Sequence, residues 1–364
     1  MSFPFYKGTL QKERPPQRVE LPASRRAEQH RAAGYKADPG LANAVNVALL
    51  LGQPLLLTGE PGTGKTRLAD SVAWELGWDE PLVFETKSTS SARDLFYTYD
   101  TLGRFHDAQL RRDGAPASPS PAPPPAAADA HAEALKYISY NALGAAILLA
   151  KRRANVEKWL PQSFAHPGDA RRSVVLIDEI DKAPRDFPND LLNEVDTMFF
   201  RVPELGISNE KIEADNDMRP VLIITSNSEK HLPDAFLRRC VYYNIPFPIK
   251  NRLQEIVESR ITEFYRQHPP QQNSPLLDDA LNFFYQLRAV DGLRKKPATA
   301  ELLGWLLYLT QRGATPGDRL GQHSKLVWES ISALVKDTDD LKLTEPTITS
   351  AVGVKPDGPA SLQS

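Results

Sequence analysis

The sequence predicts an α/β fold: a three-layer sandwich with a parallel five-stranded sheet, followed by a small all-helical domain. The first observation is a set of five short apolar runs, which are residues 54–59, 81–86, 173–178, 221–227 and 241–247. Continuous apolar runs of this kind are typical of parallel strands that are covered on both faces. The second observation is that amphipathic helical patterns follow the first and the third run. Strands that alternate with helices indicate a layered α/β domain.

Composition narrows the class of protein. Of the 364 residues, 41% are apolar and 25% are charged, as in an ordinary globular protein. The formal net charge of −2 lacks the strong positive field of a dedicated nucleic-acid binder, so nucleic acid is not the expected partner. No apolar run approaches the ~20 residues of a membrane-spanning helix, so no membrane insertion is expected. The single cysteine, Cys240, fits a cytoplasmic location and is expected to be a core residue, not a nucleophile.

Changes in composition divide the chain into segments. Residues 1–34 contain few large apolar groups and are expected to form a flexible arm. Residues 35–248 are expected to form the α/β core, interrupted by a disordered Pro- and Ala-rich insert at about 113–130. Residues 249–342 contain four helical patterns and are expected to form a lid domain, and residues 343–364 a flexible tail.

The turn after the first apolar run matches the pattern G-x-x-x-x-G-K-[ST]. Glycines allow successive backbone N–H groups to converge on phosphate oxygens, and the following helix N-terminus attracts anions. Lys65 is then expected to reach the β- and γ-phosphates, and Thr66 to hold Mg²⁺. A plain turn is the alternative, but the strand before it and the helix after it favour a P-loop NTPase. The predicted nucleotide-binding residues of this turn are Gly59, Glu60, Pro61, Gly62, Thr63, Gly64, Lys65 and Thr66.

Polar side chains end two later runs. Asp178 ends the third run and Glu179 follows it, while Asn227 ends the fourth. Because ligands of open α/β sheets bind at the carboxyl ends of strands, Asp178 is expected to hold Mg²⁺ and Glu179 to act as general base. The amide of Asn227 is expected to orient the attacking water. Acids that merely end a strand and an ordinary turn asparagine are the alternatives.

These segments together resemble the AAA+ ATPases, and within them the MoxR-type group, over roughly residues 35–309. "GEPGTGKT" is similar to Walker A, "VVLIDEIDKAP" to Walker B and "LIITSN" to the sensor 1 strand. "LPDAFLRRC" looks like the segment that carries the arginine finger, which implies this role for Arg239. Arg238 stands where the family has Asp, so either arginine, or both, is a candidate. The resemblance also implies a sensor 2 cation, for which Lys296 is the choice; a solvated helix start is the alternative.

Two further segments support the MoxR-type resemblance. Residues 90–109, followed by 140–150, look like the insert in helix 2 of the family and the region after it. Residues 196–214 are expected to form the β-hairpin before sensor 1, with "PELG" as the turn. A plain surface excursion is the alternative for this hairpin.

The resemblance implies ATP and Mg²⁺ as cofactors and a homo-oligomeric ring, most often a hexamer, with each nucleotide at a subunit boundary. It also implies chaperone-like remodelling or maturation of client proteins, with a von Willebrand factor A domain protein as partner. Two other classes stay open. One is a nucleic-acid motor or loader with the same core, and the other is a nucleotide-gated binding module with little hydrolysis, against which Glu179 argues.

Overall fold

The computed structural model describes residues 35–114, 127–207, 210–227, 232–261 and 274–354. The expected arm over residues 1–34 and the centre of the predicted insert lie outside this part of the chain. Both ends of the predicted insert at 113–130 are helical. Helix α4 (Thr101–Gly114) includes its first residues, and helix α5 (Ala127–Leu135) includes its last.

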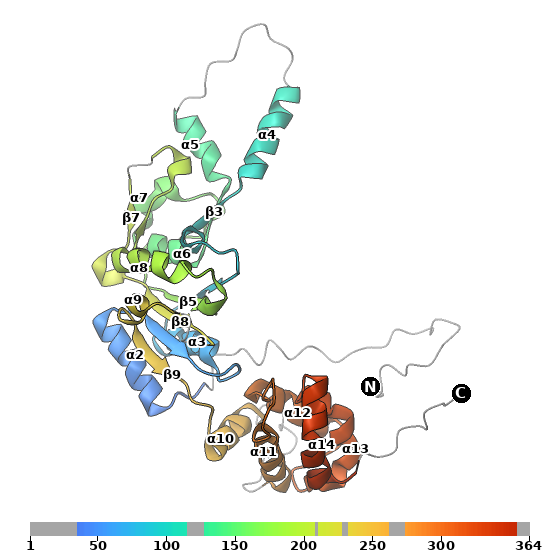
Figure 1. Ribbon diagram of the computed structural model, residues 1–364. Coiled ribbons are helices and arrows are strands. Elements are labelled where there is room, and N and C mark those ends of the chain that lie inside the picture. Colours follow the sequence, from blue (N-terminus) through green and yellow to red (C-terminus); the bar gives the residue numbers. More distant parts are fainter. Residues whose placement is uncertain (1–34, 115–126, 208–209, 228–231, 262–273, 355–364) are drawn as a thin grey trace.

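A five-stranded parallel sheet forms the centre of the larger domain, which confirms the predicted fold class (Figure 1). Its strands in spatial order are β2 (Leu82–Glu85), β5 (Val174–Asp178), β8 (Val221–Thr225), β1 (Leu55–Thr58) and β9 (Val241–Asn244). The three inner strands are almost wholly buried, whereas the edge strands alternate between half-buried and exposed residues. Strand β8 lies between β1 and β5 and pairs parallel with both. The carboxyl ends of these three strands therefore lie at the same edge of the sheet.

Helices cover both faces of the sheet. Helices α2 (Pro39–Leu51) and α3 (Lys65–Glu75) share one hydrophobic cluster with Leu55 and Leu57 of β1. Helices α6 (Ala142–Leu149) and α8 (Phe187–Thr197) share the other with Leu56. Successive side chains of a strand point to opposite faces, so β1 contributes to both clusters.

Two excursions leave this core. Strands β3 (Tyr97–Tyr99) and β4 (Ile138–Tyr140) pair antiparallel at the base of α4 and α5, which extend away from the sheet (Figure 1). The predicted hairpin is confirmed as the antiparallel pair β6 (Phe199–Phe200) and β7 (Ile212–Glu213). The connection runs from Phe200 to Ile212 and is longer than a tight turn. The expected turn "PELG" forms a 3₁₀ turn over Pro203–Leu205 within it. Short helices α7 (Arg153–Val156) and α9 (Asp234–Leu237) complete the domain.

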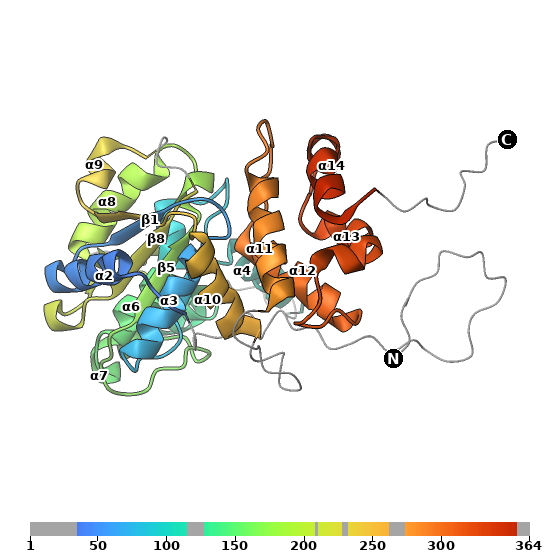
Figure 2. The same cartoon turned by 90° about the horizontal axis from the view of Figure 1, so that it is seen from below.

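The second domain is a helical bundle with a hydrophobic cluster of its own (Figure 2). Its helices are α10 (Lys250–Ile261), α11 (Pro275–Arg288), α12 (Thr299–Gln311), α13 (Ser324–Ser330) and α14 (Thr338–Val352). The indole N–H of Trp305, which is fully buried, donates to the hydroxyl of Ser330 at 2.9 Å.

The predicted tail from residue 343 is wrong as far as Val352. Helix α14 contains this stretch, including Pro346, and buries Ile348 and Val352 in the second cluster. Packing of these two side chains compensates for a proline inside the helix, which disfavours helix from the sequence alone. Among the residues that the structure describes, no helix combines the length and apolar character needed to cross a lipid bilayer.

Candidate functional site

The glycine-rich turn joins the carboxyl end of β1 to the first turn of α3. Three of its glycines have positive φ angles: Gly59 at 143°, Gly62 at 79° and Gly64 at 88°. A side chain at Gly59 would also place its Cβ atom 2.5 Å from the carbonyl oxygen of Ile245. Both the backbone conformation and this close approach therefore require glycine. The turn has the predicted form of a phosphate cradle.

Lys65 lies inside the cradle. Its Nζ atom donates to the carbonyl oxygens of Gly59 at 2.8 Å and Glu60 at 3.0 Å. Burial of the ammonium group lowers the pKa of Lys65, and nearby acids, with Asp181 and Asp178 foremost, oppose that shift. These acids keep a cation favourable in a buried position, which suits a group that must meet phosphate oxygens.

Asp178 is the centre of a hydroxyl network at the strand ends. Its Oδ1 atom accepts from the hydroxyl of Thr66 at 3.0 Å and from that of Thr225 at 2.5 Å. Thr225 Oγ1 in turn accepts from the backbone N–H of Glu179 at 2.9 Å. The structure thus brings together the predicted metal-binding residues, Thr66 and Asp178. Their oxygen atoms suit Mg²⁺, which usually takes one or two protein ligands together with water and phosphate oxygens.

Glu179 has an unusual backbone conformation. Its φ of 54° and ψ of 52° place it in the left-handed region, which is uncommon for a residue other than glycine. Its carboxylate lies between two donors: the ammonium group of Lys182 and the amide of Asn227, the latter at 3.4 Å. The left-handed turn at the end of β5 therefore aims Glu179 toward Asn227, as the proposed joint action on one water molecule requires.

Asp181 holds the loop that carries Asn227. Its Oδ1 atom accepts from the backbone N–H of Asn227 at 3.0 Å and from the hydroxyl of Ser226 at 3.2 Å. Sequence reasoning missed both Asp181 and Thr225. Each lies inside a motif, "DEIDK" or "ITSN", but nothing in the sequence indicates which neighbouring side chains would face each other.

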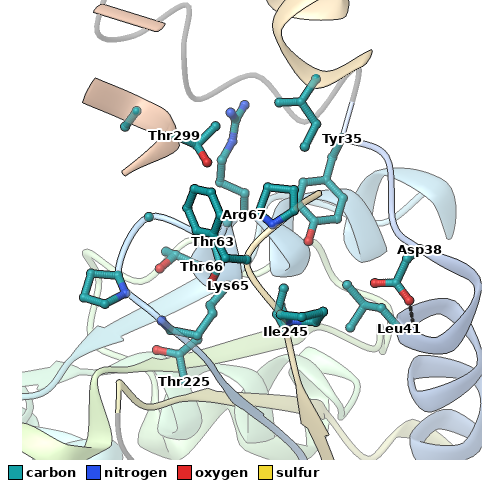
Figure 3. A pocket seen from close by; sticks show the side chains of 18 of the residues that line it. Tyr35, Asp38, Leu41, Thr63, Lys65, Thr66, Arg67, Thr225, Ile245 and Thr299 are labelled. Atoms are coloured by element: carbon teal, nitrogen blue, oxygen red, sulfur yellow. Dashed lines mark hydrogen bonds between the residues drawn. The ribbon is translucent and has the colours of Figure 1, made fainter. Parts of the chain in front are cut away.

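A cavity of about 660 Å³ opens above the cradle and extends to the helical bundle. This volume lies in the usual range for small-molecule sites. Figure 3 shows Lys65 and Thr225 on the sheet side of the cavity, Tyr35 beside it and Thr299 of α12 opposite. Residues 61–66, Asp178, Glu179, Asn227 and the half-buried Arg252 also line it. The predicted cradle residues from Pro61 to Thr66, with the predicted metal-binding and general-base residues, therefore face one space. Gly59 and Glu60, at the start of the cradle, do not line it.

The structure does not bring every predicted residue to this cavity. Arg238 and Arg239 follow α9 and are exposed, and neither lines the cavity. The Nε atom of Arg239 lies 3.2 Å from a carboxylate oxygen of Asp196. Neither arginine therefore reaches the cavity of its own chain. The arginine-finger role stays a prediction, in which these residues act on the nucleotide of a neighbouring subunit.

Lys296 is also exposed and does not line the cavity. The segment before it is fixed to the start of α14, because Asp340 accepts the backbone N–H groups of Arg294 and Lys295 at 2.9 and 3.0 Å. Arg294 also pairs with Asp339 at 3.0 Å. These contacts fix the backbone of Arg294 and Lys295 and the side chain of Arg294 at the start of α14. The sensor 2 role of Lys296 stays a prediction.

The fold and this site define a P-loop nucleotide-binding protein. Residues 55–248 match the family described as "ATPase family associated with various cellular activities (AAA)", and this match covers more than half of the 364 residues. The chain therefore belongs to the AAA family of ATPases. A search of curated proteins found no match. Among solved structures, PCH-2 from C. elegans aligns with 80% of this chain and 66% of its own, at 16% identity and a TM-score of 0.38. Similarity at this level carries no argument about function.

Proposed function

We propose that this protein binds ATP with Mg²⁺ and hydrolyses it to ADP and phosphate. The proposal is carried by the convergence of Lys65, Asp178 and Glu179 on one cavity beside the glycine cradle. Phosphoryl transfer depends mainly on positioning and charge neutralisation. Bound Mg²⁺ would supply part of that neutralisation, held by Thr66 and Asp178.

The chain's own groups have separate tasks in this proposal. Lys65 would exchange its carbonyl partners for β- and γ-phosphate oxygens. Glu179 would accept a proton from the attacking water, and Asn227, which already contacts Glu179, would orient that water. The ion pair with Lys182 occupies the carboxylate of Glu179 and must loosen before Glu179 can accept that proton.

Two variants test this function. Lys65→Ala is expected to abolish ATP binding in calorimetry, and an unchanged affinity would remove Lys65 from its role. Glu179→Gln is expected to keep ATP binding but to lower phosphate release by about 10²- to 10⁴-fold. Equal release by Glu179→Gln and the unaltered protein would contradict the hydrolytic mechanism.

We further propose that the active form is a homo-oligomeric ring, with hexamer as the expected size, in which Arg239, Arg238 or both reach the nucleotide of the next subunit. Their exposure on the outside of the core supports action across a boundary. An arginine supplied in this way contributes about 10³- to 10⁵-fold in rate. Mixing Arg239→Ala subunits with Glu179→Gln subunits should restore part of the activity, because some boundaries then combine an intact arginine with an intact glutamate. No recovery at any mixing ratio would count against this arrangement.

The client is proposed from the MoxR-type resemblance. The inserted pair β3–β4 with helices α4 and α5, and the hairpin β6–β7, support that resemblance. In this proposal, hydrolysis rotates the lid domain (residues 249–342, with α14 extending it to Val352) against the core domain (residues 35–248). The motion would remodel or mature a cytoplasmic client together with a von Willebrand factor A domain protein. The Glu179→Gln protein is expected to capture such a partner in the presence of ATP and not in its absence. Equal capture with and without ATP would contradict the proposal.

A further inference from the structure

Arg288, the last residue of α11, lies where the helical bundle meets the phosphate cradle. Its side chain is only 10% exposed. Its Nη2 atom lies 2.5 Å from Oε2 of Glu60, which is in the cradle. Its Nη1 atom donates to the carbonyl oxygen of Pro297, two residues before α12. Arg288 thus links the cradle to two helices of the bundle.

The guanidinium group also lies over the ring of Phe247, 3.4 Å from the ring centroid. Phe247 belongs to the segment between β9 and α10, the covalent connection of the two domains. The hydroxyl of Tyr285, one turn earlier on α11, donates to the carbonyl oxygen of Pro248 at 2.5 Å. The end of α11 is therefore fixed to this segment, and the planar guanidinium extends the contact to Glu60.

A second contact of the cradle with the bundle involves Gly62. A Cβ atom at this position would lie 2.6 Å from the Cβ of Ala298, the residue before α12. Helix α12 carries Thr299 and Leu303 into the wall of the cavity. Because the start of α12 packs this closely on the cradle, a shift of the bundle would change the shape of the cavity.

We propose that Arg288 is a positioning residue for nucleotide binding: through Glu60 and Phe247 it holds the lid in the orientation that shapes the cavity over the cradle. This inference rests on the proposed ATP binding. Arg288 does not line the cavity itself, so it acts on the nucleotide through the cradle and the lid. The pairing of the two charges, more than either charge alone, then determines affinity for ATP.

The test measures ATP·Mg²⁺ affinity by calorimetry, with all variants made in the Glu179→Gln protein so that hydrolysis does not interfere. Arg288→Gln and Glu60→Gln are each expected to weaken binding by about 3- to 10-fold, the range for a partly exposed ion pair combined with a cation–π contact. The double variant is expected to bind ATP no more weakly than the single variant with the lower affinity, since the two single changes remove the same interaction. The charge-reversed pair, Arg288→Glu with Glu60→Arg, is expected to recover part of the affinity.

Arg312→Gln is the matched control, because Arg312 donates to the hydroxyl of Tyr308 at 2.8 Å and pairs with Glu329 within the same bundle. It is expected to leave ATP affinity unchanged. Losses that multiply in the double variant, or an Arg288→Gln affinity equal to that of Arg312→Gln, would overturn the inference. If Arg288→Gln does not fold, Glu60→Gln with an unchanged affinity would overturn it as well. Lys65→Ala separates the two proposals: if it also binds ATP normally, the ATP site itself is wrong.

Discussion

The hydroxyl of Thr225 donates to the carboxylate of Asp178 at 2.5 Å and accepts from the backbone N–H of Glu179 at 2.9 Å. One fully buried hydroxyl group on β8 therefore fixes both acidic residues at the end of β5. The carboxylate of Asp178 and the backbone of Glu179 therefore cannot shift without changing a contact to this neighbouring strand.

Replacing Thr225 by Val should disturb both acids at once. Thr225→Val keeps the shape but leaves the part-buried N–H group of Glu179 without its hydrogen-bond partner, which should lower the free energy of unfolding by about 1–3 kcal/mol in a urea titration. ATP hydrolysis should fall as well, because Asp178 and Glu179 lose their common anchor. Thr225→Ser, which keeps the hydroxyl, is the control and should retain most of the free energy of unfolding and most of the hydrolysis rate. Equal hydrolysis rates for the Val and Ser variants would show that the hydroxyl does not position the acids.

Removal of Asp181 should separate binding from hydrolysis. Asp181→Ala frees the backbone N–H of Asn227, so this residue should no longer stay beside Glu179. We expect ATP affinity to change by less than about 3-fold and phosphate release to fall by about 10- to 100-fold. Asp186→Ala, an exposed acid five positions later, is the control for lost charge. A large loss of affinity in Asp181→Ala would instead assign Asp181 to the cradle.

Gly144 should not accept a side chain. A Cβ atom there would lie 2.0 Å from the carbonyl oxygen of Phe96, so Gly144→Ala should lower the free energy of unfolding by about 2–3 kcal/mol. A Cβ atom at Gly304 on α12 would instead meet no heavy atom within 4 Å. Gly304→Ala should therefore stabilise the protein by about 0.5–1 kcal/mol through its higher helix propensity. Urea titrations of both variants test this, and shifts of equal sign would contradict it.

The thiol of Cys240 should be inert in the folded protein. Burial, with the nearby carboxylate of Asp196, raises the pKa of Cys240 from 9.0 to about 12. The folded protein keeps this proton above pH 9 while the unfolded chain loses it, so the group's contribution to stability is lost as pH rises from 9 to 12. At pH 8, alkylation of the folded protein should be about 10³-fold slower than in denaturant. Comparable rates in both conditions would contradict the raised pKa.

The strands of the sheet and the chemistry of the cradle follow from local patterns in the sequence. The five apolar runs predict the strands of the sheet, and the three inner strands are almost wholly buried because helices cover both faces. The glycine turn, Lys65 and Thr66 were predicted from adjacent residues, because backbone conformation and helix start are local properties. Asp178 and Glu179 were predicted because the carboxyl ends of parallel strands meet at one edge of a sheet.

Which side chains from distant segments face each other depends on how the strands and helices pack. Asp181 and Thr225 anchor the acids and Asn227, yet their role depends on the order of β5 and β8 in the sheet. Lys296, the predicted lid cation, is exposed and does not line the cavity, while Arg288 of α11 reaches the cradle. Helix α14 forms in spite of a proline because its apolar side chains pack in the bundle. These outcomes depend on the packing of whole helices, which the local pattern of a sequence does not specify.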